Sequence, residues 1–165
     1  MGKKSFLNSV IFNLLVKGIN GANLYDTRVQ QEVCALPKSF SVSLAVFPYG
    51  NYICFEVNPS GVHKMRQIDN ADLQIIFKNN KIAQKVLLGK MSIADAFSSH
   101  AILLKGDIYK AMGLVRIINI VENYLFPRFY TKAIPYEKKQ VSAFKMYCYV
   151  LFGCTKKQRK LEDMK

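Results

Sequence analysis

Apolar residues recur at helical spacing near the start of the chain and alternate with polar residues further along. The segment 6–16 has its apolar side chains on one helical face, which predicts an amphipathic helix ended by Gly18 and Gly21. Residues 22–37 show no clear period, and Pro37 closes them. The segment 39–47 alternates, with apolar residues on one side and three serines on the other. This alternation predicts a half-buried strand.

Turn sequences then divide the chain into further short apolar stretches. The turns are predicted at 48–51 and 58–61, which read Pro-Tyr-Gly-Asn and Asn-Pro-Ser-Gly. Returning strands are predicted at 52–57 and 62–68, and a fourth strand at 73–77. Because tight turns join the first three strands, we expect an antiparallel meander.

The second half of the chain changes to helical spacing, apart from one more strand. A helix is predicted around 82–87, and a short helix begins at Ser92, with Asp95 three residues later as a capping partner. A fifth strand is predicted at 102–105 and is ended by Gly106. Asp107 can then cap a long helix that Pro127 ends.

The helix predicted at 108–125 is apolar around nearly two thirds of its circumference. A helix that packs once on a sheet needs an apolar face of only about 100°. This helix is therefore buried on two sides as an ordinary core helix, or it lines a cavity. The sequence alone leaves both readings open.

Composition and charge fit one globular domain with an anionic partner. Half of the 165 residues are apolar, and the net charge is +13. Such a charge favours nucleic acid, an acidic membrane surface or an acidic protein as partner. The stretch 128–165 alone carries a net charge of +7 and surrounds the apolar run 146–152.

The sequence shows no pattern that indicates catalysis or metal binding. The four cysteines form no Cys-x-x-Cys pair, and His63 and His100 lack the spacing of metal ligands. Asp69 and Asp72 have no histidine near them in sequence, so we interpret them as surface residues at the start of a strand. We therefore expect neither an enzyme nor a bound metal or cofactor.

The compartment is inferred from the cysteines and the N-terminal segment. Unpaired thiols favour a reducing, cytoplasmic environment. The first apolar segment mimics a signal peptide, but Asn8 and Asn13 interrupt it, so we expect no cleaved signal. No apolar run approaches the ~18 residues needed to span a bilayer, so only peripheral membrane contact is expected.

Five short motifs follow one another between residues 70 and 112. They are Asn-Ala-Asp-Leu at 70–73, Leu-Gly-Lys at 88–90, Ala-Phe at 96–97, Leu-Leu-Lys-Gly-Asp at 103–107 and Ala-Met at 111–112. In this order, the motifs resemble those of the sterol carrier protein type 2 (SCP-2) lipid-binding domain. The resemblance covers about residues 38–127. It implies an α+β fold, in which a curved, mainly antiparallel five-stranded sheet is covered by helices around an apolar cavity. It also implies non-catalytic binding, transfer or presentation of a sterol, fatty acyl or isoprenoid/quinone lipid.

This resemblance divides the chain and suggests a lining for the cavity. Residues 1–37 form an N-terminal helix and lead-in, 38–127 the lipid-binding domain, and 128–165 a basic C-terminal extension. The aromatic residues could also simply fill a core. The predicted lipid-binding residues are Phe47, Phe55, Ile75, Phe77, Phe97, Met112, Val115 and Ile118.

The C-terminal extension allows three readings. Its lysines beside aromatic residues suit an anionic membrane surface, its basic run 156–160 could bind nucleic acid, and the segment could instead pack back as a closing helix. Nucleic acid is the least favoured of the three. An accessory role with protein partners in a lipid or quinone pathway is an alternative for the whole chain. The predicted membrane-surface residues are Lys145, Tyr149, Phe152, Lys156, Lys157, Arg159 and Lys160.

Overall fold

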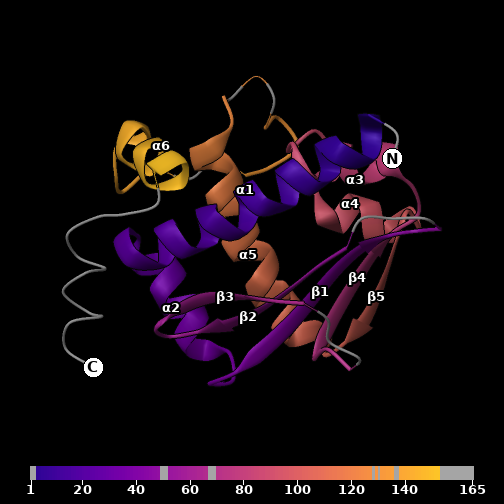
Figure 1. Cartoon of the computed structure of the whole chain (residues 1–165), viewed down its shortest axis with the longest axis horizontal. Helices are drawn as coiled ribbons and strands as arrows, with labels where there is room; N and C mark the ends of the chain where they lie inside the picture. The colour runs from indigo at the N-terminus through magenta and orange to yellow at the C-terminus, as the bar shows by residue number, and fades with distance from the viewer. Residues whose placement is uncertain are drawn as a thin grey trace.

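A computed structural model describes residues 3–48, 52–66, 70–127, 129, 131–135 and 138–152. It shows a five-stranded sheet with the helices gathered on one of its faces (Figure 1). The strands are β1 (Phe40–Val46), β2 (Tyr52–Asn58), β3 (Gly61–Met65), β4 (Leu73–Phe77) and β5 (Ile102–Gly106). The helices are α1 (Lys3–Tyr25), α2 (Thr27–Ala35), α3 (Asn80–Leu87), α4 (Ile93–Ser98), α5 (Ile108–Leu125) and α6 (Ala143–Phe152).

The sheet has the order β3-β2-β1-β4-β5. β1, β2 and β3 form the predicted antiparallel meander, and β5 pairs antiparallel with β4. β1 and β4 run parallel, because the chain crosses from β3 to the far side of β1 before it forms β4. The predicted α+β class with a mainly antiparallel sheet is confirmed, with this one parallel pair.

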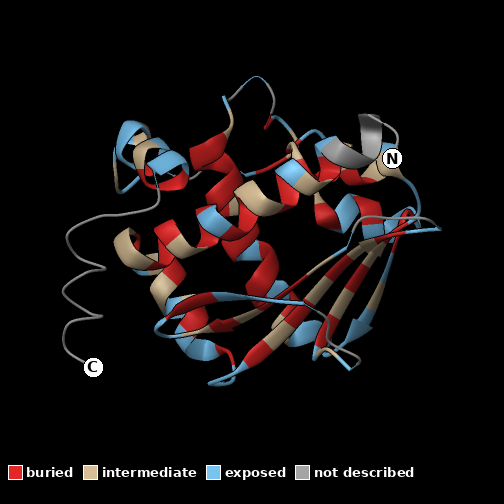
Figure 2. Cartoon of the chain, viewed as in Figure 1, coloured by how far each residue is buried: buried red, intermediate tan, exposed pale blue. Residues whose placement is uncertain are grey.

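Burial along β1 follows the alternation that the sequence predicts. Phe40, Val42 and Leu44 are fully buried toward the helices, whereas Ser41 and Ser43 on the other face are only half-buried (Figure 2). The two faces of a strand alternate residue by residue, so one side of the sheet supplies the core. The other side stays open.

Side-chain caps fix the starts of two helices where the sequence indicated. The Ser92 hydroxyl oxygen accepts a hydrogen bond from the Asp95 backbone N–H at 3.0 Å, at the start of α4. The Asp107 carboxylate accepts one from the Tyr109 N–H at 2.8 Å, at the start of α5. Each cap satisfies an N–H that has no partner within its helix.

Helix α1 continues through Gly18 and Gly21, so the predicted helix end there is wrong. A Cβ at Gly18 would lie 2.6 Å from Val121 Cγ1 of α5. A Cβ at Gly21 would lie 2.6 Å from Tyr149 Cδ1 of α6. The glycines therefore let two helices approach α1 closely rather than end it. The region 22–37, which showed no period, contains the end of α1 and all of α2.

Helix α5 is a core helix along most of its length. Twelve of its eighteen residues are buried, which accounts for its wide apolar circumference. It packs against α1 at Gly18 and against the end of α2, where Leu36 lies beside Gly113. Its first turns differ, because Ile108, Tyr109 and Met112 are exposed. The core-helix reading thus holds for the C-terminal two thirds, and the N-terminal third presents apolar side chains to solvent.

Candidate functional site

Half of the predicted lipid-lining residues lie in the closed core. Phe55, Ile75, Phe77 and Ile118 are each no more than 1% exposed. The Phe77 ring lies 6.4 Å from the Phe12 ring of α1, centroid to centroid, in a tilted arrangement. These side chains pack between the sheet and the helical layer. A ligand could reach them only if the layer opened.

Three other predicted residues lie at the surface or just beneath it. Phe97 on α4 is 44% exposed and Met112 on α5 is 48% exposed, whereas Val115, one turn further along α5, is 8% exposed. Phe97 lies five residues before the edge strand β5, and Ile108 and Met112 follow that strand by two and six residues. We call Phe97, Ile108 and Met112 the apolar border. It flanks β5 in sequence, and on α5 it adjoins the buried Val115.

Phe47 is separated from the other predicted lining residues. Its backbone N–H donates to the Phe77 carbonyl at 2.9 Å, so it extends the edge of the β1–β4 pairing. Because Val46 is buried on the helix side, alternation directs Phe47 to the open face of the sheet. There its side chain is 64% exposed.

Helix α6 packs on α1, and this places Tyr149 inside the protein. Tyr149 is 4% exposed, and its hydroxyl accepts a hydrogen bond from the Asn20 amide at 3.0 Å. Its ring meets the Tyr25 ring edge-on at 6.1 Å. The prediction of Tyr149 as a membrane-surface residue is therefore wrong, because the Gly21 position of α1 makes room for it.

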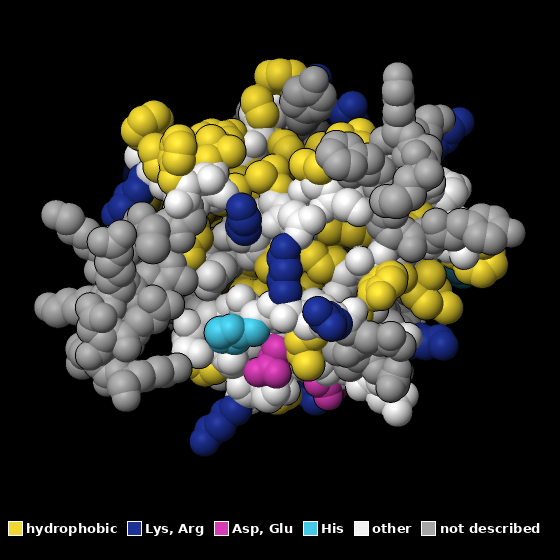
Figure 3. Space-filling model, viewed as in Figure 1, with side chains coloured by type: hydrophobic (Ala, Val, Ile, Leu, Met, Phe, Trp, Pro, Cys, Tyr) yellow, Lys and Arg dark blue, Asp and Glu magenta, His cyan; other side chains and the backbone are white. Residues whose placement is uncertain are grey.

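The outward side of α6 is apolar and basic. Phe144, Leu151 and Phe152 are between 66% and 79% exposed. Figure 3 shows hydrophobic side chains gathered over the position of α6 in Figure 1. Lys145 is exposed, and its ammonium lies 4.2 Å from the centroid of the Tyr25 ring. The predicted residues Lys156, Lys157, Arg159 and Lys160 lie outside the described residues.

A hydrogen-bond network ties the lead-in of α6 to the core. Asp26, which caps α2, is fully buried, and its carboxylate accepts hydrogen bonds from the Tyr124 hydroxyl at 2.8 Å and from the Arg28 guanidinium at 2.7 Å. The Tyr124 oxygen in turn accepts from the Gln140 N–H at 2.9 Å. Burial raises the pKa of Asp26, but the hydrogen bonds from Arg28 and Tyr124 outweigh it and hold that pKa below 3.8. Sequence periodicity gave no sign of this network.

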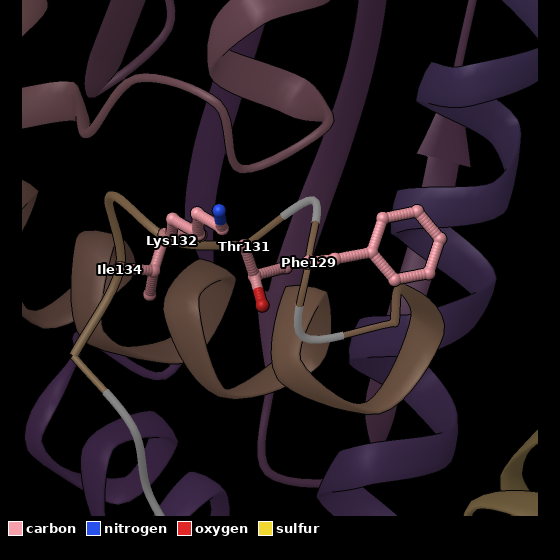
Figure 4. A pocket seen from close by; sticks show the side chains of 4 residues that line it. All are labelled: Phe129, Thr131, Lys132 and Ile134. Atoms are coloured by element: carbon pink, nitrogen blue, oxygen red, sulfur yellow. The ribbon is translucent and has the colours of Figure 1, made fainter.

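A pocket lies in the loop that follows α5. Its volume is about 430 Å³, and it is lined by Phe129, Thr131, Lys132 and Ile134 (Figure 4). Thr131 is 2% exposed, and its hydroxyl has no hydrogen-bond partner among the described residues. No sequence pattern predicts this site, because it lies in a loop without periodicity between α5 and α6. A threonine and a lysine between apolar residues were the only signal.

The described residues show one strongly perturbed acid and no metal-binding cluster. Glu122 of α5 is 2% exposed, and its Oε1 has no hydrogen-bond partner. Burial raises the pKa of this carboxyl well above its ordinary value of 4.5. Among the residues described, no three His, Cys, Asp or Glu side chains lie close enough to hold a metal ion. Nor is any described helix both long and apolar enough to cross a membrane.

Comparisons with known proteins identify the fold. No protein-family model and no curated protein matches the sequence. Among solved structures, sterol carrier protein 2 from Yarrowia lipolytica is 18% identical, with a TM-score of 0.51 over 72% of this chain and 94% of that one. A structure described as UbiJ-SCP2 ubiquinone synthesis protein is 14% identical, with a TM-score of 0.50 over 66% of this chain and 96% of that one.

The chain adopts the SCP-2 fold. The resemblance carried by residues 38–127 is thereby confirmed at the level of fold. The SCP-2 fold here has helices α1 and α2 before the sheet and α6 after it, and all three contribute side chains to one hydrophobic core. At these identities the comparisons establish the fold alone.

Proposed function

We propose that this SCP-2-fold protein binds an apolar lipid without catalysis and carries or presents it at a membrane. The observation that supports this most is α5, which is buried along two thirds of its length and exposes apolar residues at its start. Moving apolar surface out of water contributes about 25 cal/mol per Å². A lipid chain bound over the apolar border would be stabilised by this removal of apolar surface from water.

The proposed path into the protein runs along α5. Met112 is half exposed, and Val115 lies one turn further along and is almost closed off. Beyond Val115 on the same helix come the fully buried Ile118 and then Glu122. A lipid tail that displaces Met112 would meet Val115 next and could extend toward Ile75 and Phe77 as the helical layer opens. Apolar side chains suffice for this task, because lipid tails offer no hydrogen-bonding groups.

Substitution of Val115 by Trp tests this path. A Trp at this position should fill the space beside the border and lower the affinity for a fluorescent fatty acid at least ~10-fold, while overpacking costs about 1–3 kcal/mol of stability. Gln31→Trp, at an exposed position of α2, supplies the matched control. Equal affinity of Val115→Trp and Gln31→Trp for the fatty acid would place the site elsewhere.

The ligand class is tested on the protein as purified. Mass spectrometry of organic extracts should find a sterol, fatty acyl or isoprenoid lipid near one equivalent per chain. Loss of the lipid signal after Val115→Trp would connect the two experiments. A chain that carries no lipid and takes up none from vesicles contradicts the proposal.

The membrane contact is proposed to use the outer side of α6. The observation that favours it is the exposed trio Phe144, Leu151 and Phe152 on a helix otherwise packed against α1. Apolar side chains beside lysines can insert between lipid headgroups, and each Lys or Arg near an anionic surface adds ~1 kcal/mol before screening. The same surface could instead receive a protein of a lipid or quinone pathway, which remains the alternative role.

A further inference from the structure

The two outer strands of the sheet differ in what covers their free edges. Helix α1 lies along β3, where the Val62 N–H donates to the Asn20 side-chain oxygen at 3.4 Å. The Lys64 ammonium of the same strand donates to the Asn13 side-chain oxygen of α1. At the other end of the sheet, β5 is the outermost strand (Figure 1), and among the described residues only β4 forms hydrogen bonds with its backbone. The outer main-chain groups of β5 therefore remain available to another strand.

An open edge of this kind can pair with a strand of another chain through main-chain hydrogen bonds. The edge of β5 carries apolar Leu103, which is 54% exposed, and Lys105 as its single charged side chain. When the other chain is a second copy related by a two-fold axis, the two β5 strands must run antiparallel. A second copy fits if the two ends of β5 complement each other, because the end of one strand then lies beside the start of the other.

The charges at the two ends of β5 are complementary. At its end, the β4–β5 register brings Asp72 and Asp107 side by side. At its start lies Lys78, whose backbone N–H donates to the Ala101 carbonyl at 3.0 Å. All three charged residues are exposed. Antiparallel pairing of two β5 strands would therefore place Lys78 of each copy near the two carboxylates of the other.

The apolar residues around β5 are complementary in the same sense. Phe97 precedes β5 and Met112 follows it, so antiparallel pairing would bring the border residue of one copy toward that of the other. A pairing centred on Leu104 places this residue opposite itself and Leu103 opposite Lys105 of the second copy. It also keeps the two Lys105 side chains from facing each other, which would be destabilising because like charges directly across a strand pair repel.

We infer that two copies of this chain associate through their β5 edges, in an antiparallel pair centred on Leu104, so that the two five-stranded sheets become one. The inference goes beyond the proposed function and does not rest on it. Each copy carries a net charge of +13, so association requires enough salt to screen the general repulsion. Because β5 is short and the interface is correspondingly small, we expect a weak dimer with a dissociation constant in the micromolar range.

Sedimentation equilibrium of the full chain in 0.2 M salt, from about 5 to 500 µM, tests the association. The average mass of the parent should rise from that of one chain toward that of two. Leu103→Lys should weaken self-association about tenfold, because it sets a lysine opposite Lys105 at two symmetric places. Combining it with Lys105→Glu should restore most of the affinity, since unlike charges then face each other. Tyr52→Lys, a change on β2 at a similarly exposed position of the same sheet face, should have no effect.

Other results overturn the inference, provided that circular dichroism shows each variant folded. A parent that stays monomeric at all these concentrations has no such interface. Equal weakening by Tyr52→Lys and Leu103→Lys would assign the contact to the open face of the sheet and not to its edge. A double variant that stays as weak as Leu103→Lys would exclude this register.

The dimer and the lipid site can be tested separately. Leu103 lies outside the apolar border, so Leu103→Lys at concentrations too low for dimers should bind a fluorescent fatty acid as tightly as the parent does. Retained fatty-acid binding in a parent that never dimerises would overturn the interface alone and leave the proposed function standing. A parent that dimerises as expected but binds no fatty acid would support the interface while the proposed function fails.

Discussion

At the scale of single residues, the most unusual side chain is the carboxyl of Glu122. It is 2% exposed, and its Oε1 has no hydrogen-bond partner among the described groups. Burial raises its pKa well above 4.5, so the folded protein holds this proton more tightly than the unfolded chain does. The contribution of the proton to stability is complete below pH 4.5 and decreases as the pH rises toward the folded pKa.

Replacement of Glu122 by Gln should therefore stabilise the protein increasingly as the pH rises. The amide has nearly the same shape and carries no ionisable proton. The free energy of unfolding of the two proteins should differ little at pH 4 and diverge above it, in favour of Glu122→Gln, by ~1.4 kcal/mol for each pH unit between the unfolded and folded pKa values. Urea unfolding at pH 4, 5.5 and 7 measures this.

Two controls make the result specific. Glu32→Gln, at a partly exposed surface ion pair with Arg116, should not reproduce the trend, because exposed pairs contribute little. A constant difference between Glu122→Gln and the parent over this pH range would show that Glu122 is ionised in the folded protein.

At the scale of elements, the strands and helices α3, α4 and α5 followed from the sequence, whereas the length of α1 and the presence of α2 did not. Alternation in 39–47 and 73–77 depends on each strand having one buried face, which is a local property. The length of α1 depends on α5 and α6, which lie far away in sequence and use Gly18 and Gly21 as contact points. In local sequence, a glycine indicates a helix end. In this fold, Gly18 and Gly21 instead mark the places where α5 and α6 pack against α1.

The residues of the candidate site also differ in whether the local sequence could predict their burial. Phe55, Ile75 and Phe77 could be assigned to the helix side of the sheet because strand alternation fixes the side of each residue. The burial of Tyr149 could not be assigned, since its ring packs where a side chain at position 21 of α1 would lie. The pocket around Thr131 could not be predicted from the sequence either, because it is formed where a loop meets the end of α3.

The seating of α6 on α1 leads to a prediction for Gly21→Ala. Alanine normally stabilises a helix by ~1 kcal/mol relative to glycine. Here its Cβ would lie 2.6 Å from Tyr149 Cδ1 and 2.9 Å from Met146 Sδ, so we expect a net loss of about 1–3 kcal/mol in the free energy of unfolding. Thermal or urea unfolding gives the value.

A double-mutant cycle shows whether α6 causes that loss. Tyr149→Ala removes the ring that the new methyl group would strike, so Gly21→Ala should cost less in the Tyr149→Ala background than in the parent. Additive costs would mean that α6 does not rest on Gly21. The exposed substitution Lys17→Ala, on the same helix, provides the reference for a change without such a contact.

At the scale of the whole molecule, two sides that expose apolar side chains can be compared, apart from the apolar border. One side is the outer surface of α6, with Phe144, Leu151 and Phe152. The other is the open face of the sheet, where the strand register aligns Tyr52, Ala45, Ile76 and Leu103 in one row. Tyr52 and Leu103 are more than half exposed. The two sides differ in their sequence context, since α6 belongs to the stretch 128–165, which carries a net charge of +7.

This difference allows the proposed membrane contact to be tested against a matched surface. A triple substitution of Phe144, Leu151 and Phe152 by Ser should reduce co-sedimentation with vesicles of phosphatidylcholine and phosphatidylserine at least ~10-fold, because two or more apolar side chains no longer enter the headgroup region. Tyr52→Ser combined with Leu103→Ser, on the open sheet face, should leave it unchanged. Parent binding should also fall when the phosphatidylserine is omitted or when salt is raised to 0.5 M, since the charge contribution is screened.

The substitutions are chosen so that the fold survives them. All five side chains are more than half exposed, and none takes part in the packing of Tyr149 or Met146 against Gly21. A loss of vesicle binding can then be read as loss of surface contact and not as unfolding of the closing helix. If the α6 variant sediments like the parent while the sheet-face variant does not, the membrane side of the molecule is the open sheet. Equal sedimentation of all three proteins would assign the binding to charge alone, and α6 would remain only a closing helix.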